Sequence, residues 1–268
     1  MIPNILSIAG SDPSGGAGIQ ADIKAISANG GYAMAAITAL TAQNTQGVSG
    51  VRMIDPAFVA AQIASLREDI RIDAVKIGML GTAAMVDAVL AALDGLSAPI
   101  VLDPVMVAKS GDRLLQADAV AALRAGLARA TILTPNLPEA ADLLDRPEAE
   151  SAPAMEDQAT ALLALGPKAV LLKGGHLPGG ACPDLLATAE GLTWLPGPRH
   201  ATRKTHGTGC TLSSALATLL GRGLPLPEAA TGAKTYVARA IARADALSVG
   251  KGHGPTHHFH SFFEDPQS

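Results

Sequence analysis

Short apolar runs alternate with longer amphipathic stretches along this chain. The runs have the length of a strand and are rich in Val, Ile, Leu and Ala. A strand buried on both faces has such a continuous apolar pattern, so the runs predict a mostly parallel sheet. Strands are expected at residues 4–9, 33–40, 74–79, 99–103, 131–134 and 168–173, with an antiparallel pair at 184–188 and 192–195.

Amphipathic stretches rich in Ala and Leu predict helices between these strands. They are expected at residues 18–28, 56–69, 82–93, 117–130, 156–165, 210–221 and 227–247. Asp55 and Pro56 supply a cap and a first-turn proline for the second of these helices. The alternation indicates an α/β fold of three layers, in which helices cover both faces of a mostly parallel central sheet.

A single domain is expected over residues 1–268, because no repeat, low-complexity linker or abrupt change of composition divides the chain. Its last part, residues 250–268, is rich in histidine, a composition typical of metal binding. No carboxylate or cysteine lies in register with these histidines. We therefore expect a flexible, solvated tail there.

Composition excludes several classes of protein. Of the 268 residues, 48% are hydrophobic and 16% are charged, which excludes a disordered or fibrous chain. The 20 Lys and Arg against 24 Asp and Glu leave a net charge of −4, so nucleic acid is not an expected partner and small molecules are. Two cysteines cannot build a disulfide framework. Neither a signal peptide nor a run long enough to span a bilayer is visible, so a cytoplasmic protein without a membrane partner is expected.

Candidate chemistry lies directly after the predicted strands, where ligands bind in open parallel sheets. Gly207, Thr208 and Gly209 lead into an apolar helix, whose first backbone N–H groups would form an anion site. Cys210 lies in the first turn, where the helix dipole favours a thiolate able to act as nucleophile or proton acceptor. The alternatives are a plain turn with a helix cap and a small buried cysteine.

Oxygen ligands and a lysine follow three other strands. Asp103 ends one strand, and Asn136 and Glu139 follow the next one, one helical turn apart. Such ligands suit Mg²⁺, which also binds phosphate. Capping of a helix by Asn136 and Glu139 is an equal alternative. Lys173 is placed to reach a phosphate from the same edge, unless it only faces water.

A flat ring could be recognised by residues of two other segments. Gln43 offers an amide that pairs with an aminopyrimidine-like edge, while Met79 and Val105 offer apolar faces. A surface glutamine and core packing are the alternatives. The loop from Gly10 to Gly18, with Asp22 one turn into the next helix, contains neither a P-loop nor a dinucleotide fingerprint.

Long segments of the chain closely resemble one family over nearly the whole length. They are Gly10-Ser11-Asp12-Pro13-Ser14-Gly15-Gly16-Ala17-Gly18, Thr41-Ala42-Gln43-Asn44, Asp103-Pro104-Val105-Met106, Thr134-Pro135-Asn136 and His206-Gly207-Thr208-Gly209-Cys210. They resemble the bacterial hydroxymethylpyrimidine/phosphomethylpyrimidine kinases of thiamine biosynthesis, of the ribokinase-like superfamily. The resemblance implies ATP-dependent transfer to 4-amino-5-hydroxymethyl-2-methylpyrimidine and then to its monophosphate, by a homodimer.

The resemblance also implies residue roles. Gln43, Gly10 and Asp22 would bind the pyrimidine edge, and Met79 and Val105 its ring. Asp103 and Glu139 would hold Mg²⁺. The nucleotide would be bound by Lys173, Asn136 and Thr208. The amides of Gly207, Thr208 and Gly209 would stabilise the transferring phosphoryl group beside Lys173 and Cys210.

Two other functions compete with a pyrimidine kinase. A pyridoxal or pyridoxine kinase of the same superfamily would act on a similar flat hydroxymethyl substrate. A cysteine-dependent acyl transferase would use Cys210 as nucleophile with His206 as base. No carboxylate in the sequence obviously orients His206, and Asp103, Glu139 and Lys173 would then have no role.

Overall fold

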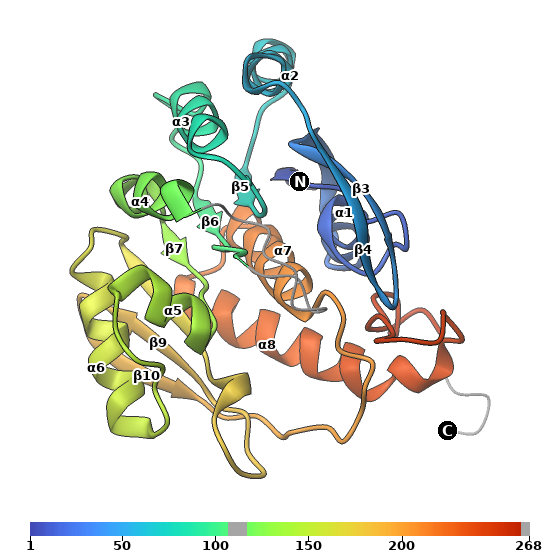
Figure 1. Cartoon of the computed structure of the whole chain (residues 1–268), viewed down its shortest axis with the longest axis vertical. Helices are drawn as coiled ribbons and strands as arrows, with labels where there is room; N and C mark the ends of the chain where they lie inside the picture. The colour runs from blue at the N-terminus through green and yellow to red at the C-terminus, as the bar shows by residue number, and fades with distance from the viewer. Residues whose placement is uncertain (107–116, 264–268) are drawn as a thin grey trace.

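A central sheet forms the middle layer of the protein, whose computed structural model describes residues 1–106 and 117–263 (Figure 1). In these residues the sheet has eight strands in the order β10-β9-β8-β7-β6-β5-β1-β2. All neighbours from β2 to β8 are parallel, whereas β9 is antiparallel to both of its neighbours, β8 and β10. The strands are β1 (Asn4–Ala9), β2 (Tyr32–Ile37), β5 (Ala74–Ile77), β6 (Ile100–Leu102), β7 (Ile132–Leu133), β8 (Ala169–Lys173), β9 (Asp184–Thr188) and β10 (Gly191–Leu195).

Helices cover both faces of this sheet, which confirms the predicted three layers. One face carries α2 (Pro56–Asp69), α3 (Ala83–Ala92), α4 (Ala117–Ala125), α5 (Leu137–Leu144) and α6 (Ala152–Leu163). The other carries α1 (Gly18–Ala28), α7 (Thr208–Gly221) and α8 (Leu226–Ala242). Alternate residues of β1 serve the two cores: Ile5 packs with α7, while Leu6 and Ile8 pack with the first group.

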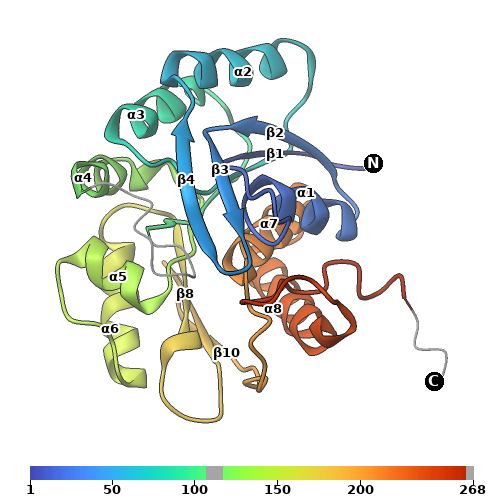
Figure 2. The same cartoon turned by 45° about the vertical axis from the view of Figure 1, so that its right-hand side comes forward.

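A separate hairpin of β3 (Ala39–Asn44) and β4 (Gly47–Met53) stands beside the main sheet (Figure 2). The prediction of one continuous strand over residues 33–40 is therefore wrong. The chain leaves the sheet at Thr38, which is fully buried and whose Oγ1 donates to the Met79 carbonyl at 2.7 Å. The hairpin contains Gln43, one of the residues predicted to bind the flat ring.

Several helix boundaries differ from the predictions. Helix α5 was expected only through the capping alternative for Asn136 and Glu139, and α6 begins at Ala152 because the Ser151 side chain caps it. The helices expected to reach residues 130 and 247 end earlier, at Ala125 and Ala242, and each is followed by a short 3-10 turn. These differences lie at element ends, where capping rather than periodicity decides.

The histidine-rich C-terminal segment is packed against the protein. Thr256 is fully buried, and His257 and His258 are buried as well. The prediction of a solvated tail is therefore wrong for these residues, while residues 264–268 lie outside those described. Within the described ranges, none of the helices has both the length and the apolarity needed to cross a membrane.

Candidate active site

The turn before α7 is shaped by Gly207. This residue is the N-cap of the helix and has a φ of 76°, and a Cβ on it would lie 1.8 Å from the Gly16 carbonyl oxygen. Glycine is therefore required for both conformation and space. Thr208 and Gly209 open α7, whose first-turn amides lack partners within the helix. A Cβ on Gly209 would lie 3.3 Å from Lys173 Nζ, so the turn faces this lysine.

Lys173 joins two carboxylates in front of this turn. Its Nζ lies 2.9 Å from Asp103 Oδ1 and 3.8 Å from Glu139 Oε2. Burial raises the pKa of Glu139 to about 7, although Lys173 opposes the shift. Burial would lower the pKa of Lys173, but the two carboxylates outweigh it and raise the pKa to about 12. The structure thus brings together three predicted residues from β8, α5 and the end of β6.

Asn136 and Glu139 form a capping box at the start of α5. Asn136 Oδ1 accepts from the Glu139 amide, and Glu139 Oε2 accepts from the Asn136 amide, both at 2.8 Å. The capping alternative is confirmed, and it leaves Glu139 facing Lys173. Contact of Asn136 with a nucleotide stays a prediction.

Two carboxylates suit a magnesium site of the kind that also uses phosphates and water. Among the described residues, no group of three or more His, Cys, Asp and Glu could hold a metal by protein ligands alone. Mg²⁺ usually takes one or two carboxylates and completes its shell with water and substrate phosphates. Asp103 and Glu139 fit this donor set.

Cys210 lies in the first turn of α7, as predicted, but its thiol is not activated. Burial raises its pKa to about 11, and the Lys76 ammonium and the Gly18 amide only partly oppose that shift. The expectation that the helix dipole favours a thiolate is wrong for the ligand-free protein. Burial disfavours the thiolate more than the Lys76 charge and the Gly18 amide favour it.

Asp22 lies inside the core rather than at the surface of the site. Its carboxylate is fully buried and accepts from Lys76 Nζ at 2.8 Å, Ser7 Oγ at 2.6 Å and Ser214 Oγ at 2.8 Å. These bonds occupy both oxygens, so direct binding of the substrate by Asp22 lacks support here. Lys76 was not predicted from the sequence, although a lysine inside the apolar run of β5 was a visible signal.

The structure brings Gly10 beside Met79 and links Gln43 to the same region, but among the residues described it shows no contact of Val105 with them. A Cβ on Gly10 would lie 2.9 Å from Met79 Cε. Thr41 Oγ1 lies 2.9 Å from the Ser11 carbonyl oxygen and 3.2 Å from Gln43 Oε1. Val105 is half-buried and lies two residues after Asp103. Thr41 thereby links Gln43 to Ser11, the residue after Gly10.

His206 has a carboxylate partner that sequence reasoning did not find. Its Nε2 lies 2.7 Å from Asp12 Oδ2. Burial would raise the pKa of Asp12, but hydrogen bonds from His206 and Ser14 hold it below its ordinary value. Nε2 of His206 is therefore engaged by Asp12, while the charges that shift the pKa of Cys210 belong to Lys76, Asp22 and Asp103. The pairing thus does not build a cysteine and histidine dyad.

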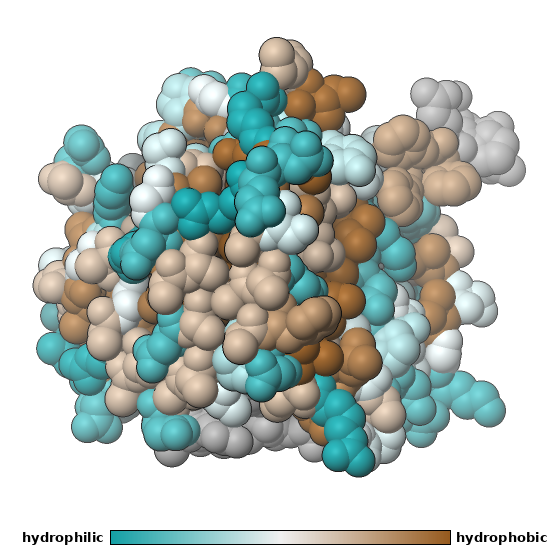
Figure 3. Space-filling view, turned by 90° about the horizontal axis from the view of Figure 1, so that it is seen from above, coloured by the Kyte–Doolittle hydropathy of each residue, from teal (hydrophilic) through white to brown (hydrophobic). Residues whose placement is uncertain are grey.

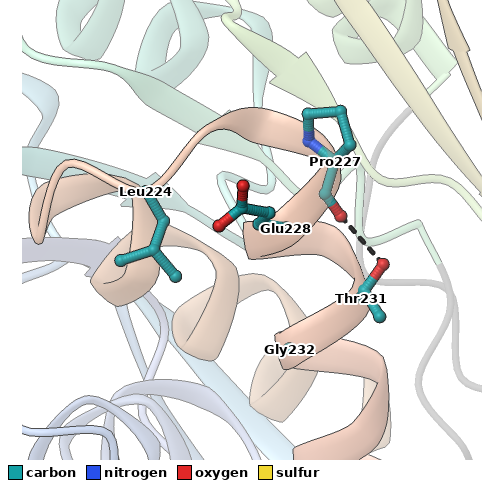
Figure 4. A pocket seen from close by; sticks show the side chains of 5 residues that line it. All are labelled: Leu224, Pro227, Glu228, Thr231 and Gly232. Carbon is teal, nitrogen blue, oxygen red and sulfur yellow. Dashed lines mark hydrogen bonds between the residues drawn. The ribbon is translucent and has the colours of Figure 1, made fainter.

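A surface hollow lies at the start of α8 (Figure 4). It is lined by Leu224, Pro227, Glu228, Thr231 and Gly232. The hollow adjoins the C-terminal end of α7, and a helix of that length spans about 20 Å. It is therefore remote from the turn Gly207–Gly209 at the other end of α7, which we call the anion turn.

The fold and the site define a small-molecule kinase of the ribokinase-like class. The model of the phosphomethylpyrimidine kinase family matches residues 12–257, and the chain belongs to this family. It is 52% identical to the hydroxymethylpyrimidine/phosphomethylpyrimidine kinase of Escherichia coli, over 97% of this chain and 98% of that protein.

Solved structures of two kinases share the fold. A pyridoxal kinase of Bacillus subtilis in complex with ADP has a TM-score of 0.90 at 34% identity, covering 98% of this chain and all of the other. A phosphomethylpyrimidine kinase of Clostridium difficile has a TM-score of 0.79 at 40% identity, covering 89% of this chain and 99% of the other.

Proposed function

We propose that this kinase of thiamine biosynthesis transfers phosphate from ATP twice. The first acceptor is the hydroxyl of 4-amino-5-hydroxymethyl-2-methylpyrimidine, and the second is the phosphate of the product. The proposal rests on one observation above all: the Gly207 turn faces Lys173, which pairs with Asp103, while the residues predicted to bind the ring include Gly10 beside Met79 and Gln43 linked through Thr41 to Ser11. Family membership supports the same substrates.

Charge neutralisation and positioning drive such a transfer, because the transition state is loose and spreads charge over the phosphoryl oxygens. The first-turn amides of α7 point toward that charge, and Lys173 supplies a cation at the same place. Lys173 stays protonated at neutral pH since its pKa is raised to about 12. These groups stabilise developing charge without reorganisation of water.

Mg²⁺ is the metal we propose, with Asp103 and Glu139 as its protein ligands. When bound, it would neutralise negative charge on the nucleotide phosphates. Asp103 already receives hydrogen bonds from Lys173 and from Thr134 Oγ1 at 3.1 Å, which fix its orientation. The buried site keeps these carboxylates away from bulk water.

The two acceptors differ in their need for a base. A primary alcohol must lose its proton as the new bond forms, and we propose the Cys210 sulfur as the acceptor. The second acceptor is a phosphate, which is mostly deprotonated near neutral pH. Cys210 is thus expected to matter more for the first transfer.

A homodimer in the cytoplasm completes the proposal. Apolar side chains on the hairpin and on α2 are solvent-exposed in the single chain, among them Val51, Met53 and Phe58. Figure 3 looks down on this end of the molecule and shows apolar residues among polar ones. Sedimentation of wild type and Val51→Glu tests this part, because a charge in a dimer interface would favour the monomer.

A single assay tests the reaction. The enzyme receives Mg²⁺ and ATP with the hydroxymethylpyrimidine, and the monophosphate and diphosphate are resolved over time, with pyridoxal as a parallel acceptor. We expect the monophosphate first and the diphosphate after it. Arrest at the monophosphate would overturn the second step, and a preference for pyridoxal would favour the pyridoxal kinase alternative that the fold also supports.

A further inference from the structure

The C-terminal segment touches two parts of the site that are distant in the sequence. We call residues 250–258 the C-terminal strap. At one end it lies against Thr45, at the tip of the hairpin: the His253 amide donates to the Thr45 carbonyl at 2.8 Å, and the Gly252 amide lies 3.1 Å from Thr45 Oγ1. A Cβ on Gly252 would lie 1.9 Å from the Thr45 carbonyl oxygen. The strap and the hairpin tip are therefore in close contact, two residues from Gln43.

At its other end the strap supports the anion turn. The His206 amide donates to the Gly254 carbonyl at 3.0 Å. His258 Nε2 lies 3.0 Å from Thr211 Oγ1, and that hydroxyl donates to the Gly207 carbonyl at 2.8 Å. A hydroxyl has one proton, so Thr211 accepts its second hydrogen bond from His258, whose Nε2 carries the hydrogen. A chain of hydrogen bonds thus leads from the strap to the residue that shapes the turn.

The strap is fixed to the core rather than resting on the surface. Thr256 and His258 are buried, the Tyr236 hydroxyl donates to the His258 carbonyl at 2.8 Å, and the His257 amide donates to the Ala240 carbonyl at 2.9 Å. Burial, with the nearby charges of Lys24 and His257, lowers the pKa of His258 to about 4. The imidazole is therefore neutral at physiological pH, as its hydrogen bond to Thr211 requires only one N–H.

We infer that the C-terminal strap holds the pyrimidine-reading hairpin and the phosphoryl-binding turn in register, with Thr45 and His258 as positioning residues. The inference rests on the proposed function for the identity of the acceptor. The hairpin is a separate two-stranded sheet, so its position depends on contacts outside the main sheet. A displacement of about 1 Å between an acceptor and a transferring group can cost on the order of a hundredfold in rate.

Two pairs of variants test the contacts at the two ends of the strap separately. Thr45→Val removes the hydroxyl that faces Gly252, and Thr45→Ser restores it. His258→Leu removes the donor to Thr211, and His258→Gln returns an N–H at a similar distance. Thr193→Val serves as the matched control, because Thr193 is exposed on β10, at the far edge of the sheet.

Steady-state kinetics of both transfers supply the first readout. We expect Thr45→Val to raise the KM for the pyrimidine about tenfold with the KM for ATP within about twofold, since it moves the hairpin alone. We expect His258→Leu to lower kcat of both transfers about tenfold, with recovery in His258→Gln. Equal effects on both KM values, or no loss in His258→Leu, would overturn the inference.

Amide hydrogen exchange supplies a readout that does not depend on the substrate. Thr45→Val should speed exchange at residues 43–48, and His258→Leu at residues 206–211, with Thr193→Val unchanged at both. Unchanged exchange in both variants would overturn the inference that the strap positions the hairpin and the turn. If wild type phosphorylates neither pyrimidine, the proposed function fails, while the exchange data still decide on the strap.

Discussion

The ammonium of Lys76 lies 2.8 Å from Oδ2 of Asp22, and both side chains are fully buried. The pair lies under Cys210, since Ser214, one turn further along α7, also donates to Asp22. Burial alone would lower the pKa of Lys76, but Asp22 and the more distant Cys210 and Asp103 raise it above the ordinary value of a lysine. Lys76 is therefore charged in the folded protein, and its ammonium donates to both oxygens of Asp22.

Removal of one partner of this pair should destabilise the protein strongly. Lys76→Met leaves the Asp22 carboxylate buried without its cation, and we expect a loss of about 3–5 kcal/mol in the free energy of unfolding. The double variant Asp22→Leu with Lys76→Met should recover most of that loss, because no lone charge remains. Urea unfolding of the three proteins measures both changes. A double variant no more stable than Lys76→Met would show that the pair is not the cause.

Gly207→Ala should abolish most activity and also destabilise the protein, because its methyl group would clash with backbone at a positive φ. The added methyl group would meet the Gly16 carbonyl and force the anion turn apart, so kcat should fall at least about a hundredfold, as for loss of an oxyanion donor. Gly223→Ala is the matched control, because Gly223 has a φ of 86° and open space around it. Kinetics and thermal unfolding of both variants are compared. Similar kinetics in the two would contradict the role of the turn.

The parts of the fold set by local pattern were predictable. The predicted ranges 4–9 and 18–28 match β1 and α1, and Asp55 caps α2 by accepting from the Ala57 and Phe58 amides. The hairpin was not predictable in this way. Its departure from the sheet depends on the hydrogen bond between Thr38 and Met79, which are 41 residues apart. Such a contact leaves no trace in hydrophobic periodicity.

The same distinction applies to the site. Asp103, Glu139 and Lys173 could be placed together because each follows a parallel strand, and the carboxyl ends of these strands share one edge. The partners of Asp22 and His206 could not be predicted in this way, since Lys76 is 54 residues from Asp22 and Asp12 is 194 residues from His206. The burial that raises the pKa of Cys210 is likewise a property of the packed chain.

Magnesium binding to the ligand-free enzyme should weaken below about pH 7. The pKa of Glu139 is raised to about 7, so its carboxyl takes up a proton there and loses the charge that attracts the cation. The dissociation constant for Mg²⁺ should then rise up to about tenfold per pH unit as pH falls. Calorimetric titration from pH 8 to pH 5.5 measures this dissociation constant. The variant Glu139→Gln is expected to bind Mg²⁺ weakly at every pH, without this pH dependence. A flat profile in wild type would exclude Glu139 as a ligand.

The rates of the two phosphoryl transfers should depend on pH in different ways. Because the pKa of Cys210 is about 11, its thiolate fraction at pH 7–9 rises about tenfold per unit. If the thiolate accepts the proton of the alcohol, kcat of the first transfer rises with the same slope, while the second transfer stays flat since its acceptor is already ionised. Cys210→Ala should remove the slope and lower the first rate by roughly a hundredfold, with a much smaller loss in the second. Rapid-quench measurement of each transfer across this range tests the assignment. Equal losses in both transfers, with the slope retained, would mean that Cys210 only positions the acceptor and that another group takes the proton.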